Sequence, residues 1–115
     1  MDRFKDARSA ATFAPEKMMK VNLFSSPRMF CDVYGLQAGQ EQTAHAHASA
    51  DKVYFVIDGT GVFRIGDQER TATSGHAVWA PAGESHAVRN PGPGRLTLLV
   101  FMAPHPGQSS PAGGG

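Results

Sequence analysis

The sequence predicts an all-β protein, a single small domain in which short strands form a sandwich or barrel closed on itself. Its 115 residues suit one domain with one modest core, and 41% of them are hydrophobic, which indicates a globular chain. The 13 glycines and 8 prolines are spread between short apolar runs, a distribution typical of many turns between strands. About nine short strands within about 85 residues favour a closed β architecture over an open sheet.

The first strands are predicted over residues 17–24 and 28–36, two largely apolar runs separated by Ser25-Ser26-Pro27. Gln37-Ala38-Gly39 has the composition of a turn. The segment after this turn is expected to be a strand, and it carries His45 and His47.

Residues 52–57 are the strongest strand signal, because all but the first are β-forming residues. Asp58-Gly59 predicts a hairpin turn, with residues 61–65 as the returning strand. Gly66-Asp67 then turns the chain into a strand over residues 68–72.

Two short strands, residues 77–80 and 85–89, flank the turn Ala80-Pro81-Ala82-Gly83. Pro81 at the second position of that turn and Gly83 at the fourth suit a type I turn. The loop at residues 90–94 leads to a last strand over 95–102. The predicted organisation is therefore a loosely ordered lead-in over residues 1–15, a barrel over 16–102, and a flexible tail rich in Pro, Gly and Ser over 103–115.

Both faces of the strand at residues 52–57 are apolar, since Tyr54 and Val56 alternate with Val53, Phe55 and Ile57. A strand at the surface of a small barrel is expected to show one polar face. The outer face therefore needs a cover. We expect a homodimer, with the N-terminal segment as the alternative cover.

Composition also excludes several classes of function. A formal net charge of +1 without a basic run gives no support for nucleic-acid binding. Cys31 is the single cysteine, so neither an intramolecular disulfide nor a cysteine-based zinc site can form. No apolar run approaches a membrane span, and residues 1–15 lack the apolar core of a signal peptide. We therefore expect a soluble, cytoplasmic protein without membrane contacts.

Three histidines are the most informative feature of the chain. His45 and His47 are two residues apart, so within a strand their side chains point to the same face, whereas on a helix they would diverge. His86 follows the proline turn and would add a third imidazole from another strand. Three imidazoles with open positions are typical of a working metal site.

Two spaced groups of residues lie within residues 39–90. The first group is Gly39, His45, His47 and Gly59. The second group is Gly75, Pro81, Ala82, Gly83, His86 and Asn90. In order and spacing they resemble the two motifs of the cupin superfamily, and the chain resembles its small single-domain, Cupin_2-like members. The resemblance implies a double-stranded β-helix, that is, a jelly-roll barrel, with a site inside the barrel and His45, His47 and His86 as metal ligands.

The sequence departs from that pattern at two positions. Cupins usually carry a glutamate seven residues before the closing glycine of the first motif, as a fourth ligand, and Lys52 stands there instead. Asp51 is adjacent, but in a regular strand its side chain faces the opposite way unless a bulge intervenes. The sequence leaves undecided whether Asp51 or Lys52 points into the site. His76 stands where cupins often have an aspartate, and it is expected to lie away from the metal.

Lys52 permits three interpretations. If it points inward beside a metal, its pKa is expected to fall, and it would act as a general base or pair with an anionic substrate. Its long stem could instead carry the ammonium group out of the barrel mouth. The ammonium group could also take the place of the metal and leave a metal-free pocket.

The sequence thus predicts a small metal-binding cupin. Its pocket is expected to be lined by Tyr54, Val56, Trp79 and Val88, and its divalent ion would be iron, zinc, nickel, manganese, cobalt or copper. The favoured function is a metal-dependent enzyme of the dioxygenase, isomerase or lyase type, acting on a small, anionic organic molecule, with Lys52 as its catalytic residue. The alternative is a non-catalytic binding or sensing protein, metal-free because Lys52 replaces the glutamate.

Overall fold

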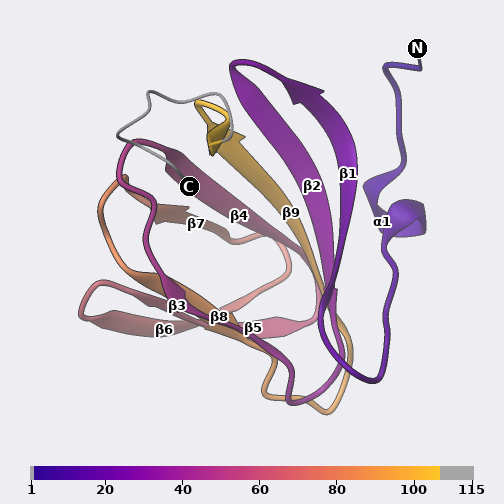
Figure 1. The fold of residues 1–115 in the computed structure, drawn as a ribbon. Coiled ribbons are helices and arrows are strands. Elements are labelled where there is room, and N and C mark those ends of the chain that lie inside the picture. Colours follow the sequence, from indigo (N-terminus) through magenta and orange to yellow (C-terminus); the bar gives the residue numbers. More distant parts are fainter. Residues whose placement is uncertain (1, 107–115) are drawn as a thin grey trace.

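The computed structural model of the chain describes residues 2–106 and consists of two antiparallel β-sheets packed face to face (Figure 1). One sheet has five strands in the order β1-β2-β9-β4-β7, and the other has four in the order β3-β8-β5-β6. The strands are β1 (Met19–Ser26), β2 (Met29–Leu36), β3 (Glu41–His45), β4 (Asp51–Asp58), β5 (Thr60–Ile65), β6 (Gln68–Thr73), β7 (Ala77–Ala80), β8 (His86–Arg89) and β9 (Leu96–Ala103).

This is the double-stranded β-helix that the cupin resemblance implied, in a single domain. Each predicted strand is present, and the predicted bounds lie within two residues of the observed ones. Gly59 has a φ of +93°, and a Cβ there would collide with the carbonyl oxygen of Arg95, so the hairpin between β4 and β5 requires glycine.

The core lies between the two sheets and is formed by inward-facing residues of β2 and of β4 to β9. In β4 the residues Lys52, Tyr54 and Val56 turn inward and are buried, whereas Phe55 is exposed on the outer face. The apolar core members are Tyr34, Leu36, Tyr54, Val56, Phe63, Ala72, Ala80, Val88, Leu96, Leu98 and Val100.

The segment before β1 runs along the outer face of the five-stranded sheet (Figure 1). It contains a short helix, α1 (Ala7–Ala10), capped by the carboxylate of Asp6. Arg8 pairs with Asp58 at the end of β4, with Nε and Oδ2 2.7 Å apart. The backbone at Thr12 lies so close to Gly35 that no side chain would fit there. The predicted lead-in therefore covers part of the outer face. Residues 107–115 of the predicted tail lie outside the described part of the chain.

Within residues 2–106, no helix has both the length and the apolar character that a membrane crossing requires.

Candidate metal centre

His45, His47 and His86 converge at one point inside the sandwich. Each offers one ring nitrogen, and these three atoms all lie within 4.8 Å of one another. The ring centroids are 4.2 Å apart for His45 and His86, 4.9 Å for His45 and His47, and 5.5 Å for His47 and His86. The structure thus brings together the three histidines singled out in the sequence.

His47 is not positioned by the strand that was predicted to carry it. β3 ends at His45, so the two histidines do not lie on one regular strand. The register of β3 against β8 is also irregular between Gln42 and His45, where His45 comes to lie opposite His86. His47 is held instead by the backbone, because its carbonyl oxygen accepts a hydrogen bond of 2.8 Å from the Gly83 N–H.

The turn before β8 therefore positions two of the three histidines. The N–H of Glu84 donates to the carbonyl oxygen of Pro81 at 3.1 Å, so the turn spans residues 81–84 and begins one residue later than predicted. Gly83 has a φ of +84°, which a type II rather than a type I turn requires at that position. The turn connects the segment containing His47 to the start of β8, where His86 stands.

Asn90 fixes the other end of β8, and its hydrogen bonds explain why the second motif has an asparagine at this position. Its buried amide nitrogen donates to the carbonyl oxygens of Leu36, at 2.9 Å, and Gly94, at 2.8 Å, while its side-chain oxygen accepts from Gly92. Its backbone pairs with Gly39 and Gln40. The turn before β3 is thereby fastened to β8, which holds the two histidine-bearing strands in register.

Backbone carbonyls orient two of the imidazoles. Nδ1 of His45 lies 2.9 Å from the carbonyl oxygen of Thr43, and Nδ1 of His86 lies 3.2 Å from that of Glu84. A carbonyl oxygen only accepts, so each Nδ1 carries the proton and each Nε2 keeps its lone pair. Nε2 of His86 is buried and has no hydrogen-bond partner. A buried acceptor without a partner is costly, and a metal ion at this point would satisfy it. The residues therefore fit a divalent ion.

Burial also keeps these rings neutral. It lowers the pKa of His86 to about 4, and the positive charge of Lys52 acts in the same direction. Burial likewise lowers the pKa of His45 below its ordinary value. Imidazoles that are neutral at pH 7 can bind a metal without first losing a proton.

Lys52 points inward and stands beside the histidines. Its side chain is 2% exposed, and its Nζ donates to Oε1 of Gln42 at 3.2 Å. The hydroxyl of Tyr54 donates to the same oxygen at 2.7 Å. Nζ also lies 4.9 Å from the ring centroid of Tyr54 and 5.3 Å from that of Tyr34, where the ring faces attract a cation.

Asp51 faces away from the site, which answers the question that the sequence left open. Its side chain is exposed, and its Oδ1 accepts a hydrogen bond of 2.9 Å from the N–H of Ala82. Asp51 therefore supports the turn that holds His47, while the position of the usual cupin glutamate is occupied by an ammonium group.

The buried ammonium group has a consequence for stability. Burial lowers the pKa of Lys52 to about 7, and the charge of Lys20 acts in the same direction. In the unfolded chain this lysine titrates near pH 10.4, so between about pH 7 and 10 the unfolded state binds more protons. Stability therefore rises with pH in that window, by up to about 1.4 kcal/mol per unit for this group.

We expect Lys52→Met to be more stable than the wild type below pH 7, with an advantage that shrinks as the pH rises towards 10. Urea unfolding at several pH values, with a chelator present, measures the difference in unfolding free energy. Lys17→Met, at an exposed site, controls for general charge effects. A difference independent of pH would show that the Lys52 ammonium group is not desolvated.

A cavity of about 350 Å³ opens in front of this cluster. Several of its lining residues were not predicted from the sequence, among them Lys20, Asp32, Tyr34 and Gln42. One feature of the sequence could have indicated them. Asp32 is a charged residue within an apolar run, and it shares a strand face with Tyr34. Lys20 and Lys52 lie on the same cavity, and each is within 5.3 Å of the Tyr34 ring centroid.

The predicted pocket residues are distributed differently. Tyr54 contacts the site through Gln42, and Val56 and Val88 are buried in the core without lining this cavity. Trp79 is 62% exposed and lies beside a second pocket at the opposite edge of the sandwich. His76 also lies by that second pocket, away from the three histidines as expected.

Comparison with known proteins accords with this geometry. The Cupin_2 family, described as a cupin domain, matches residues 32–102, well over half of the chain. The chain belongs to the Cupin_2 family. This cupin is similar in structure to the TT1209 protein of Thermus thermophilus, with a TM-score of 0.88 and 43% sequence identity over 91% of this chain and 100% of that one.

Two curated relatives of this cupin are more distant. An oxalate-binding protein of Thermotoga maritima is 25% identical over 74% of this chain and 69% of its own length. The tetracenomycin polyketide synthase protein TcmJ of Streptomyces glaucescens is 30% identical over 62% of this cupin, which spans 50% of that relative.

Proposed function

We propose that this cupin is a metal-dependent enzyme acting on a small organic anion. The observation that carries the proposal is the convergence of three ring nitrogens within 4.8 Å beside a cavity that also contains the Lys52 ammonium group. His45, His47 and His86 would hold the ion and leave coordination positions free. A bound divalent ion would supply Lewis acidity to a substrate oxygen.

The residues of the chain bind and orient the substrate. Lys20 and the buried Lys52 both line the cavity, which therefore contains two ammonium groups and one carboxyl group, that of Asp32. A carboxylate in this cavity would accept hydrogen bonds from Lys52, which is held in place by Gln42 and the two tyrosine rings. With its pKa lowered to about 7, Lys52 can also accept or release a proton near neutral pH.

A binding protein without turnover is the second candidate. One relative is an oxalate-binding protein, and oxalate is a small dianion of the kind that this cavity suits. The hydrogen bond to Gln42 and the tyrosine rings stabilise the Lys52 ammonium group without any metal. In this form Lys52 replaces the usual glutamate and the pocket binds its ligand metal-free.

Substrate depletion at stoichiometric protein concentration separates these candidates. The protein is loaded in turn with iron(II), zinc, nickel, manganese, cobalt or copper and incubated with a panel of small carboxylates, including oxalate, followed by NMR. Loss of a carboxylate that stops on adding a chelator supports the enzyme. Saturable binding that needs no metal and causes no loss supports the binding protein. Absence of both binding and loss contradicts both candidates.

We also propose that this cupin forms a homodimer through the outer face of its five-stranded sheet. Trp79, Val53 and Phe101 lie side by side across β7, β4 and β9. Trp79 is 62% exposed, Phe101 43% and Phe55 38%, so the N-terminal segment leaves these side chains uncovered. Such an apolar row on one face is self-complementary across a two-fold axis.

We expect the wild type to sediment as a dimer and Trp79→Ser with Phe101→Ser to sediment as a monomer. Losing two large apolar side chains from each partner removes most of the burial that would hold the pair together. Phe4→Ser is the control, because Phe4 is also a large, exposed apolar residue but lies in the N-terminal segment. A wild type that remains monomeric at 0.1 mM (about 1 mg/mL) contradicts the proposal.

A further inference from the structure

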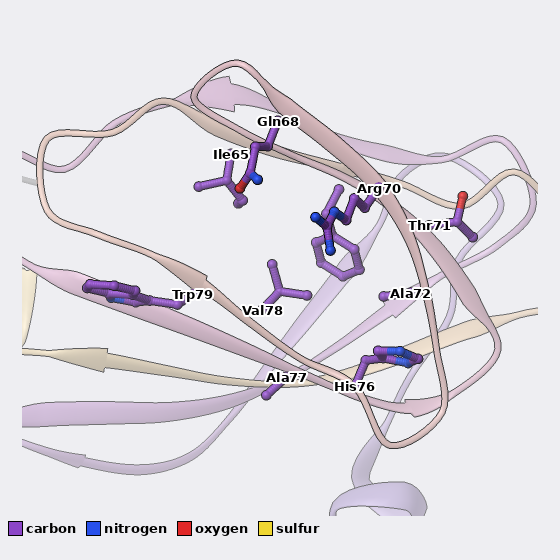
Figure 2. Close-up of a pocket in the computed structure, with 10 residues that line it drawn as sticks. Ile65, Gln68, Arg70, Thr71, Ala72, His76, Ala77, Val78 and Trp79 are labelled. Carbon is purple, nitrogen blue, oxygen red and sulfur yellow. The ribbon is translucent and has the colours of Figure 1, made fainter.

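A second pocket of about 350 Å³ lies at the edge of the sandwich formed by β6 and β7 (Figure 2). These are the outermost strands of their sheets at that edge. The three histidines lie elsewhere, beside a cavity lined by residues of β1, β2, β3, β4 and β9, and the two pockets share no lining residue. The second pocket is therefore a separate place at which a ligand could bind.

The pocket has an apolar floor and wall. Phe63 and Ala72 are buried, and Val78 faces them from β7, since it pairs with the inward-facing Tyr54. In Figure 2 the side chain of Val78 points into the pocket towards Arg70, and Trp79 lies at one end. This surface would receive the apolar body of a ligand.

Arg70 brings a positive charge to that apolar surface. It pairs directly with Phe63 across β5 and β6, so both side chains project from the core-facing side of the sheet, Phe63 buried and Arg70 exposed at the edge strand. Its neighbour Glu69 pairs with Arg64 and therefore lies on the opposite face. Within the described residues, Arg8–Asp58 is the ion pair that forms, so no carboxylate neutralises Arg70. A guanidinium group in this position is a two-pronged donor for a carboxylate.

We propose that this pocket binds a small carboxylic acid with an apolar or aromatic body, which places its carboxylate on Arg70 and its body on Phe63, Ala72 and Val78. Gln68, which lies on the same side of β6 as Arg70 and also lines the pocket, would contact the polar end. A simpler interpretation is that an inward-facing charge on an edge strand prevents sheets from joining edge to edge. That role needs the charge but no ligand, so a binding experiment distinguishes the two.

The test is a two-dimensional NMR titration of the full chain with phenylacetate, in the presence of a chelator. We expect saturable shifts centred on Ala72 and Val78, and at least tenfold weaker binding in Arg70→Gln, because a charge-assisted hydrogen bond is lost. The matched control is Arg64→Gln, which removes an arginine from the adjacent strand on the opposite face. His86→Ala, which alters the metal centre, should bind phenylacetate like the wild type.

Two further measurements distinguish binding in this pocket from a folding defect of Arg70→Gln and from non-specific binding to an apolar surface. Val78→Phe keeps the pocket apolar but fills it, and should also weaken binding at least tenfold. Phenylacetamide, which has the same body without the charge, should bind at least tenfold more weakly than phenylacetate. The proposal is overturned if Arg70→Gln binds as well as the wild type, if the amide binds equally well, or if the shifts centre on His45 and His86. Absence of binding at 10 mM (roughly −2.7 kcal/mol) would also overturn it.

Discussion

Replacing His86 by alanine is expected to lower the affinity for a divalent metal roughly 100-fold or more, since even changes beyond the direct ligands cost 10- to 100-fold. His86 is the most constrained of the three candidate ligands. It is 2% exposed, lies in β8, and has its ring fixed by the carbonyl oxygen of Glu84. Without it, His45 and His47 would remain as a two-ligand site open to water.

The measurement is elemental analysis after loading and dialysis, followed by competition titration with a chelator of known affinity. His76→Ala serves as the control, because His76 is exposed and its Nδ1 lies near Thr73 rather than the cluster. Equal metal content in His86→Ala and the wild type would contradict the three-histidine centre. Thermal unfolding with and without metal checks that the variant is folded: metal should raise the Tm of the wild type and not that of His86→Ala.

The strands could be predicted from the sequence because their signals are local. The β-forming run in β4 and the glycines at its turns are read from neighbouring residues. The three histidines could be found for a similar reason, from spacing and from the order of two motifs. The strand argument for His45 and His47 was nevertheless wrong in detail, because β3 ends at His45 and the distant turn at Gly83 holds His47.

Contacts between the sheets could not be predicted. The hydrogen bond from Lys52 to Gln42 joins β4 to β3, two strands in different sheets, and period-two alternation says which face a side chain takes but not what it meets. The exposure of Trp79 could not be predicted for the same reason. An aromatic residue in a short apolar strand suits either face, and only the pairing of β7 with β4 decides it. The face taken by Asp51 depended on a distant partner, the N–H of Ala82.

Lys52→Glu is expected to increase the metal affinity roughly 100-fold, equivalent to about 2.7 kcal/mol. The substitution removes a positive charge that points at the site and puts a carboxylate in its place. Two unit charges about 4 Å apart interact by about 4 kcal/mol at an effective dielectric constant of 20. An interaction of this size is large enough to account for the expected gain in affinity. Without metal the same carboxylate would be buried beside neutral imidazoles, so metal should raise the Tm of Lys52→Glu more than that of the wild type.

Two matched variants separate the causes of this gain. Lys52→Gln removes the charge without adding a ligand, and should give an intermediate affinity. Asp51→Asn changes the neighbouring residue, whose side chain faces the proline turn, and should leave the metal affinity unchanged. Competition titrations on all four proteins measure the order. Equal affinities would place Lys52 too far from the ion to influence it. Metal binding in Lys52→Glu alone, with none in the loaded wild type, would reject the metal-dependent enzyme, because the natural lysine would then have converted a metal centre into a metal-free binding pocket.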